Sequence, residues 1–319
     1  MRAEIAESPD VFARAVANVP TGLTLPHAFY TVARGSSDAA ANILSYEFMR
    51  ELGLPMTSLP PSIFSVGNGV NLHGATVLVV SQSGASQDLV RSAKGARTSG
   101  ATVIGLINQS GSPIEATAHL TLPIGAGPEL AVPATKSVIG SIAAGMALLS
   151  ALKPAYAPRA AANARALEVP VHPQSKSIIS ALLRANHVFI IGRDTGFGAA
   201  QELALKLKET CALHAEAYSS SEVLHGPLQL ATNPLLVLIL DSGQPDVQDS
   251  LNTAEARFRA ISGSVFRLRP SDVGASDLTP ATAAALLLYL TYPIVLATAL
   301  ALGHDPDRPA TLSKVTQTT

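Results

Sequence analysis

The sequence predicts an α/β protein of two tandem domains, each built on a doubly wound parallel sheet. The chain has 319 residues, which exceeds the usual size of one domain, roughly 100–200 residues. Apolar residues make up 47% and charged residues 14% of the chain, a composition that favours a large buried core. In addition, one order of strand, turn and helix occurs twice, about 160 residues apart, and such alternation is typical of βαβ units.

The first repeated element is an apolar strand followed by a small-residue turn and an alanine-rich helix. It occurs as Phe29-Tyr-Thr-Val-Ala-Arg-Gly-Ser-Ser-Asp-Ala-Ala-Ala41 and as Val188-Phe-Ile-Ile-Gly-Arg-Asp-Thr-Gly-Phe-Gly-Ala-Ala200, with an arginine at the same place. Two more apolar strands follow each copy. They are Ala75–Val80 and Thr102–Ile107 in the first half, and Leu235–Leu240 and Val265–Leu268 in the second. Parallel strands joined by helices predict a three-layer sandwich of the flavodoxin-like or Rossmann-like type.

The segment Lys153–Pro173 separates the two repeats. It contains four prolines around an alanine-rich middle, which itself has helical potential. Prolines interrupt regular structure, and domain boundaries commonly fall in such segments. We therefore expect a first domain at residues 1–155, which carries the phosphate-binding loops described below, and a second domain with the C-terminal tail at residues 170–319.

Charge, cysteine content and hydropathy exclude several classes of function. The net charge of -1 provides no field to attract nucleic acid or an anionic membrane. The single cysteine, Cys211, rules out an intramolecular disulfide and a multi-cysteine metal site. The apolar stretch Ala281–Leu302 is long enough to span a bilayer, but it contains Pro293 and lacks flanking basic clusters, so we expect a buried core helix. No secretory signal is visible, and we expect a cytoplasmic protein that uses no metal ion and no organic cofactor.

Hydroxyl-rich loops follow two strands of the first half. Gly35-Ser-Ser37 follows the first strand, and Ser81-Gln-Ser-Gly-Ala-Ser86 follows the next. Ligands of an open parallel sheet bind beyond the carboxyl ends of its strands, where hydroxyls, backbone amides and a helix N-terminus can hold a phosphate. The chain has no P-loop pattern with its lysine, which favours a monophosphate over a nucleotide triphosphate. The alternative is that these serines are ordinary turn and N-cap residues.

The corresponding loop of the second half, Asp241-Ser-Gly243, opens with a carboxylate. A carboxylate repels a phosphate. We therefore expect the phosphate site in the first half only.

Charged residues of the second half fall at a helical spacing. In the predicted helix Gln201–Cys211, the residues Glu202, Lys206 and Glu209 stand at positions i, i+4 and i+7, away from the apolar stripe. They form either an acid–base group or, as is common, a solvated face with i,i+4 ion pairs. Downstream, His225 precedes a Gly-Pro pair, so we expect it in a turn where its imidazole can reach a ligand.

Seven motifs carry a family resemblance that spans essentially the whole chain. They are Met1-Arg-Ala-Glu-Ile-Ala-Glu-Ser-Pro9, Ser81-Gln-Ser-Gly84, Glu129-Leu-Ala-Val-Pro-Ala-Thr-Lys136, Ala204-Leu-Lys-Leu-Lys-Glu209, His214-Ala-Glu-Ala-Tyr218, His225-Gly-Pro-Leu228 and Asp305-Pro-Asp-Arg-Pro-Ala-Thr-Leu-Ser-Lys314. In this order they resemble the sugar-isomerase (SIS) family, in particular the isomerase half of glucosamine-6-phosphate synthases. The resemblance implies two SIS domains and a sugar 6-phosphate substrate.

The resemblance also implies roles for individual residues. The contacts to phosphate and sugar correspond to Ser37, Ser81, Gln82, Ser83, Ser86 and Val132. Glu209 corresponds to the base that moves a proton between C1 and C2, with Lys206 and Glu202 as its partners. His225 corresponds to the histidine that opens the sugar ring and reaches over from the neighbouring subunit of a homodimer. Lys314 corresponds to the lysine that handles the open-chain carbonyl, for example as a Schiff base.

Two residues and one missing domain depart from the synthase pattern. Ala134 stands where the synthase has a substrate-contacting serine, and Ser86 replaces a threonine. We expect the first change to alter sugar preference rather than the reaction. The glutamine-hydrolysing domain that precedes the isomerase half is absent from this sequence, so we expect no supply of ammonia from within the chain. An excised half of a synthase would have the same features.

From the sequence we expect a deaminase-isomerase that converts glucosamine 6-phosphate, or a related hexosamine 6-phosphate, to fructose 6-phosphate and ammonia. A fructosamine-6-phosphate deglycase and the isomerase half of a synthase are alternative enzymes. A non-catalytic phosphosugar sensor is an alternative of another class. Sensors of this family carry a helix-turn-helix domain, for which the residues before Phe29 leave no room.

Overall fold

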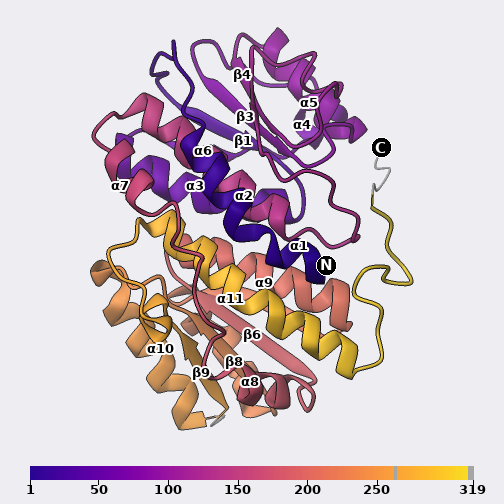
Figure 1. The fold of residues 1–319 in the computed structure, drawn as a ribbon, viewed down its shortest axis with the longest axis vertical. Coiled ribbons are helices and arrows are strands. Elements are labelled where there is room, and N and C mark those ends of the chain that lie inside the picture. The colour runs from indigo at the N-terminus through magenta and orange to yellow at the C-terminus, as the bar shows by residue number, and fades with distance from the viewer. Residues whose placement is uncertain (262–263, 315–319) are drawn as a thin grey trace. The chain divides into compact units, whose positions relative to one another are not determined.

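The chain forms two compact units in the computed structural model, which describes residues 1–261 and 264–314. The first-sheet unit consists of Glu7–Glu129, Lys136–Arg165 and the tail residues Ser313 and Lys314. The second-sheet unit consists of Met1–Ala6, Leu130–Thr135 and Ala166–Leu312. Each unit contains one parallel sheet with helices on its faces (Figure 1). The predicted fold class of two doubly wound α/β sheets is confirmed.

The first sheet has five parallel strands in the spatial order β2-β1-β3-β4-β5. They are β1 (Phe29–Val32), β2 (Met56–Ser58), β3 (Thr76–Ser81), β4 (Thr102–Ile107) and β5 (Leu120–Pro123). The central strands are apolar on both faces because helices cover the sheet on both sides. Phe29 of β1 lies opposite Thr76 of β3, so the carboxyl ends of these two strands meet at the same edge.

Helices on the first sheet form two layers. They are α2 (Ser8–Ala17), α3 (Ser36–Leu52), α4 (Ser62–Ser65), α5 (Gln87–Thr98), α6 (Lys136–Leu152) and α7 (Ala157–Ala162). α4 and α5 lie on one face, whereas α2, α3 and α6 lie on the other (Figure 1). Gly145 permits the close approach of α6 to α3, since a Cβ at this position would overlap the side chain of Leu44.

The second sheet has four parallel strands in the order β7-β6-β8-β9. They are β6 (His187–Gly192), β7 (His214–Ser219), β8 (Leu236–Leu240) and β9 (Val265–Leu268). The helices and 3-10 turns of this unit are α1 (Arg2–Ala6), α8 (Ser175–Leu182), α9 (Thr195–Cys211), η1 (Glu222–Leu224), η2 (Pro227–Thr232), η3 (Pro245–Val247), α10 (Gln248–Ile261), η4 (Pro270–Val273) and α11 (Pro280–Ala301). α10 packs on the sheet through a buried cluster that includes Phe189, Val237 and Phe258.

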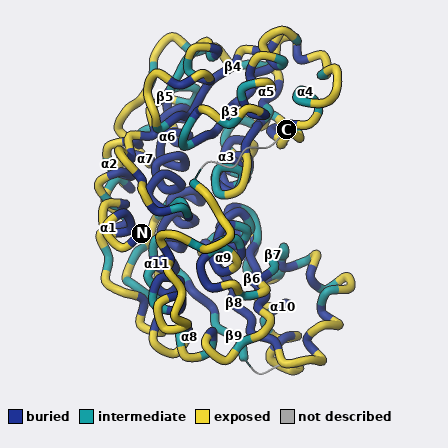
Figure 2. The backbone as a smooth tube through the Cα atoms, turned by 90° about the vertical axis from the view of Figure 1, so that its right-hand side faces the viewer, coloured by how far each residue is buried: buried dark blue, intermediate teal, exposed yellow. Residues whose placement is uncertain are grey.

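α9 and α11 lie side by side in the second-sheet unit (Figure 1). Hydrogen bonds between them include one from Thr195 Oγ1 to the carbonyl of Pro280 at 2.9 Å and one from the Tyr292 hydroxyl to Glu202 Oε1 at 3.2 Å. α11 is long and apolar enough to cross a membrane, with a mean hydropathy of 1.9, but 78% of that stretch is buried in the protein (Figure 2). Such burial is typical of a core helix.

Candidate active site

The loop after β3 forms a tight turn at the carboxyl edge of the first sheet. Ser81 is buried, and its Oγ accepts a hydrogen bond from the backbone N–H of Gly84 at 3.0 Å. The Oγ of Ser83 accepts from Ala85 N–H at 3.3 Å. Gly84 has φ +62°, and a Cβ there would clash with Ser112, so both the backbone angle and the space favour glycine.

Two helices begin beside this loop in the first-sheet unit. Ser86 is the N-cap of α5, and Ser37 stands in the first turn of α3 after Gly35, which has φ +53°. Because β1 and β3 are neighbouring parallel strands, their following loops share one edge of the sheet. The structure therefore brings Ser37 and the Ser81–Ser86 loop to one place, where two helix N-termini supply N–H groups and positive partial charge.

An arginine that sequence analysis did not assign lies among these loops. Arg34 donates from Nε to Asp88 Oδ2 at 2.8 Å, and the Asp88 side chain is fully buried while that of Arg34 is 54% exposed. In the second-sheet unit, Arg193 of the corresponding post-strand loop donates from one Nη group to the hydroxyls of Ser219 and Ser221. The signal was visible in the sequence, since both repeats carry an arginine at the same place.

The charged line on α9 is buried rather than solvated. The side chains of Glu202 and Lys206 are 0% exposed, and that of Glu209 is 23% exposed. Lys206 Nζ lies 3.5 Å from Glu202 Oε1 and also donates to Glu209 Oε2. Burying charges is costly unless they are paired, so this arrangement does not fit the alternative of a solvated face for Glu202 and Lys206.

His225 lies in the turn between η1 and η2, as its Gly-Pro neighbours predict. It is exposed, and its backbone N–H donates to the carbonyl of Glu222 at 2.9 Å. Gly226 follows with φ +140°, a conformation that side chains rarely adopt. The imidazole is thus presented at the surface of the second-sheet unit.

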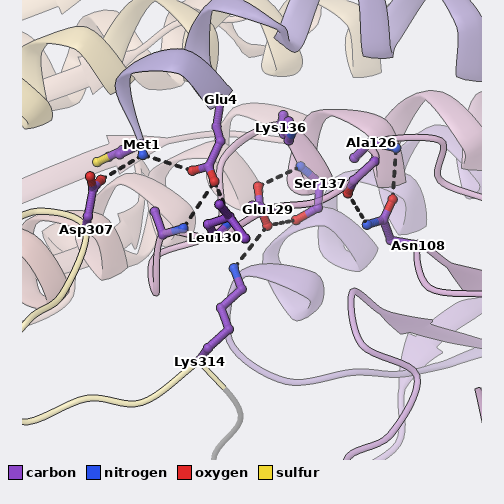
Figure 3. A network of polar contacts seen from close by, with 12 residues as sticks. Met1, Glu4, Asn108, Ala126, Glu129, Leu130, Lys136, Ser137, Asp307 and Lys314 are labelled. Atoms are coloured by element: carbon purple, nitrogen blue, oxygen red, sulfur yellow. Dashed lines mark hydrogen bonds and ion pairs between the residues drawn. The ribbon is translucent and has the colours of Figure 1, made fainter.

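Val132 belongs to a loop of the second-sheet unit that several contacts hold in place. Its N–H donates to the carbonyl of Asp307 at 2.9 Å. Glu4 Oε1 accepts from the N–H groups of Leu130 and Ala131, and the terminal ammonium of Met1 bonds both Glu4 and Asp307 (Figure 3). Burial tends to lower the pKa of this ammonium, but the hydrogen bonds that it donates to Asp307 and Glu4 raise the pKa overall.

Lys314 is held by a buried carboxylate of the first-sheet unit. Its Nζ lies 3.4 Å from Oε2 of Glu129, whose side chain is 0% exposed. Glu129 also accepts hydrogen bonds from Ser137, at 2.6 Å from the hydroxyl and 3.1 Å from the backbone N–H (Figure 3). Glu129 opens the motif Glu129–Lys136, but its local sequence carries no signal of this contact with the tail.

The predicted site residues therefore fall into two groups. The first-sheet unit holds Ser37, Ser81, Gln82, Ser83, Ser86 and Lys314. The second-sheet unit holds Val132, Glu202, Lys206, Glu209 and His225. The first group offers hydroxyls, an amide and an amine, and the second offers two carboxylates, an ammonium and an imidazole.

The grouping of candidate metal ligands and the burial of the single cysteine bear on metal-binding and thiol chemistry in the described part of the chain. Within residues 1–261 and 264–314, no group of three His, Cys, Asp or Glu side chains could hold a metal ion. Burial raises the pKa of the Cys211 thiol to about 11. A thiol with this pKa is a poor nucleophile at neutral pH.

Comparison with known proteins identifies one protein family. The SIS domain family matches residues 23–151 and 181–265 of the chain. The glutamine–fructose-6-phosphate aminotransferase (isomerizing) of Sulfurisphaera tokodaii is 30% identical over 293 residues, a match that covers 89% of this chain and 49% of the relative. The enzyme of the same name from Brucella abortus is 28% identical over 356 residues, covering 98% and 58%. The chain spans about half the length of the curated relatives it matches.

Solved structures share the fold over nearly the full chain. A provisionally named phosphosugar isomerase from Silicibacter pomeroyi superposes with a TM-score of 0.81 at 32% identity and covers 96% of this chain and 99% of its own. A glucosamine-6-phosphate deaminase from Thermotoga maritima superposes with a TM-score of 0.78 at 19% identity, covering 99% of each chain. At 19% identity, the similarity to the Thermotoga maritima protein concerns the fold alone.

Proposed function

Because this chain belongs to the SIS-domain family, we propose that it is an enzyme that deaminates and isomerises a hexosamine 6-phosphate. Glucosamine 6-phosphate is the proposed substrate, and fructose 6-phosphate and ammonia are the products. The observation that carries this proposal is the buried line on α9, where Lys206 stands between the carboxylates of Glu202 and Glu209. Buried charged groups on one helix face are expensive for stability and are typical of functional sites.

Glu209 is the proposed base. It is the only one of the three side chains with appreciable exposure, so its carboxylate can reach a ligand while Lys206 holds it in position. In the open-chain sugar, removal of the C2 proton gives an enolamine, and its return at C1 leaves an imine at C2. Water then hydrolyses the imine to the ketone and releases ammonia. A positioned carboxylate serves both proton transfers.

The other residues bind and prepare the sugar. The hydroxyls of Ser37, Ser81, Ser83 and Ser86, with Gln82, would hold the 6-phosphate at the helix N-termini, and Val132 would contact the sugar. His225 would open the ring, and its exposure supports a role at a shared site of a homodimer. Lys314 would act on the open-chain carbonyl as an amine.

A second candidate function is the isomerase half of a glucosamine-6-phosphate synthase. Two relatives reported above are glutamine–fructose-6-phosphate aminotransferases, and this chain spans about half of their length. In that case the physiological direction is the formation of glucosamine 6-phosphate, with ammonia supplied from outside the chain.

Product analysis distinguishes the two candidates. The purified protein is incubated with glucosamine, galactosamine and fructosamine 6-phosphates, and ammonia and fructose 6-phosphate are measured together. Equal amounts of both products at catalytic rates support the deaminase. Background ammonia release from every substrate, together with glucosamine 6-phosphate formation from fructose 6-phosphate only when ammonia is added, supports the synthase half. No turnover in either direction contradicts both.

A further inference from the structure

A cavity of about 530 Å³ lies in the second-sheet unit, at the carboxyl edge of its sheet. The loop that follows β8, residues 241–245, forms one wall, and the segment that follows β9, residues 269–278, forms the other. Ligands of open parallel sheets bind at this edge, and cavities of roughly 300–1,000 Å³ suit small molecules. None of the proposed catalytic or phosphate-binding residues lines it.

The carboxylate of Asp241 does not present its charge to this cavity. Its side chain is 0% exposed, and both oxygens are occupied. Oδ1 accepts from Gly243 N–H at 2.8 Å and from Gln248 Nε2 at 2.9 Å, while Oδ2 accepts from Arg267 and from Arg269 Nε at 3.1 Å. Two arginines thus neutralise Asp241, so its charge does not repel a phosphate from this half as the sequence led us to expect.

Arg269 is the cation that this cavity offers to a ligand. Its side chain is 41% exposed and lines the cavity, whereas that of Arg267 is 3% exposed and is bonded also to Asn252, Glu255 and Gln248. Arg269 uses Nε for Asp241, and no described residue accepts from its two Nη groups. A planar guanidinium with spare N–H donors is suited to a phosphate.

Hydroxyl and carboxylate groups complete the wall. Ser242 is 4% exposed, and its Oγ has no hydrogen-bond partner among the described residues. Asp277 contributes a carboxylate to the wall. It has φ +56° and accepts a hydrogen bond from Ser276 Oγ at 3.0 Å. Non-glycine residues in the left-handed region are uncommon and cluster at ligand-binding sites. The carboxylate of Asp277, which lines the cavity, can accept hydrogen bonds from the hydroxyls of a polyol.

We propose that this cavity is a second binding site for a phosphate-bearing polyol, the chemical class of a sugar phosphate. The phosphate contacts Arg269, and the hydroxyls contact the carboxylate of Asp277. The site is separate from the Ser81–Ser86 loop, so one chain binds two such ligands. A site of this kind lets the concentration of a sugar phosphate act on the protein away from the proposed catalytic residues.

Calorimetric titration with fructose 6-phosphate tests the stoichiometry. The unmodified protein binds two ligands per chain, and Ser83→Asp removes only the one at the first sheet. In the Ser83→Asp background, Arg269→Gln weakens the remaining binding about tenfold or more, because a charge-assisted contact is lost. Ala275→Phe places a large side chain in the cavity, leaves the residues of the ion pairs unchanged and abolishes the remaining binding. Arg257→Gln, an exposed change on α10, is the matched control and leaves binding unchanged.

Inorganic phosphate is the second probe. Equal affinity for phosphate and fructose 6-phosphate in the Ser83→Asp protein means that the phosphate supplies the binding, whereas weaker binding of phosphate means that the polyol hydroxyls contribute. The proposal is overturned if the Ser83→Asp protein binds neither probe, or if its binding survives both Arg269→Gln and Ala275→Phe. If the first-sheet site is wrongly assigned, Ser83→Asp instead keeps two sites while Ala275→Phe still removes one.

Discussion

The Nζ of Lys314 lies 3.4 Å from Oε2 of Glu129, a buried carboxylate 185 positions earlier in the chain. Polar C-terminal tails are ordinarily frayed and dispensable. Here the tail lysine has a defined partner, and that partner is itself fixed by two hydrogen bonds from Ser137. The contact holds the amine of Lys314 beside Glu129 in the first-sheet unit.

This contact predicts that Glu129 positions Lys314 for catalysis. Lys314→Ala removes the amine and should reduce turnover to near background. Glu129→Gln should reduce kcat about tenfold or more, because an amine that is wrongly positioned loses much of its rate enhancement. Steady-state kinetics of both variants measure the effect. Borohydride treatment with substrate, followed by mass analysis of the tail peptide, reports whether the amine still reacts. Ser137→Ala, which keeps the carboxylate, should have the smaller effect. Full activity in Lys314→Ala would contradict the proposed role of the amine.

Glu209→Gln tests the proposed base. The amide keeps the shape but cannot accept the substrate proton, so kcat should fall by about 10²–10⁴-fold. The fold should survive, because Lys206 retains Glu202 at 3.5 Å as a partner. Lys208→Gln changes an exposed residue of the same helix and serves as the control. A loss of less than tenfold with an intact fold would leave Glu209 a purely structural member of the ion-pair line.

Mixed subunits test the shared site. His225→Ala and Glu209→Gln are each expected to be inactive as pure dimers. If His225 acts in the neighbouring subunit's site, a mixed dimer contains one site with both residues intact. Mixing should therefore restore measurable activity, up to about one quarter of normal for random exchange of equal amounts. Activity in a sedimenting monomer, or no recovery after verified exchange, would exclude sharing.

Asp241 predicts an acid-sensitive contribution to stability. Burial alone would raise the pKa of Asp241, but hydrogen bonds from Gln248 and Gly243 and the charge of Arg267 lower it below its ordinary value of 3.8. Its stabilising effect is thus fully present above about pH 4 to 5 and is lost as the pH falls through the folded-state pKa. Asp241→Asn should cost about 1–3 kcal/mol near pH 7, because the buried Arg267 loses one of its two carboxylate partners and keeps Glu255 at 2.8 Å.

Denaturant unfolding of Asp241→Asn at several pH values measures this effect. The gap in unfolding free energy between the two proteins should be constant at neutral pH and narrow below pH 3.8. Asp249→Asn, an exposed change on the same helix as Gln248, should cost less than about 1 kcal/mol. A gap that does not change down to acid unfolding would mean that the charge of Asp241 contributes nothing.

Sequence patterns predicted the fold where apolar strands are continuous. Thr102–Ile107 and Val265–Leu268 match β4 and β9 to the residue. β7 was not anticipated as a strand, because His-Ala-Glu-Ala-Tyr-Ser alternates polar and small residues at the edge of the sheet. Short edge strands such as β2 carry too few apolar residues to stand out.

The candidate site was predictable in its residue types but not in its electrostatics. The helical spacing of Glu202, Lys206 and Glu209 indicated one face, yet periodicity cannot tell that α11 covers this face and buries it. Likewise, the pairing of Glu129 with Lys314 joins distant segments, and no local pattern signals such a contact. The neutralisation of Asp241 by arginines about 26 residues later escaped detection for the same reason.

The composition of the second-sheet unit has a consequence for dissecting the protein. That unit takes Met1–Ala6 and Leu130–Thr135 from the part of the chain that otherwise builds the first sheet. A fragment that begins at Ala166 would consequently lack both Glu4 and the loop whose N–H groups donate hydrogen bonds to Glu4. Cleavage in the proline-rich linker should therefore leave two fragments that fold poorly alone and complement each other when mixed. The two repeats depend on each other for folding and are not separable domains.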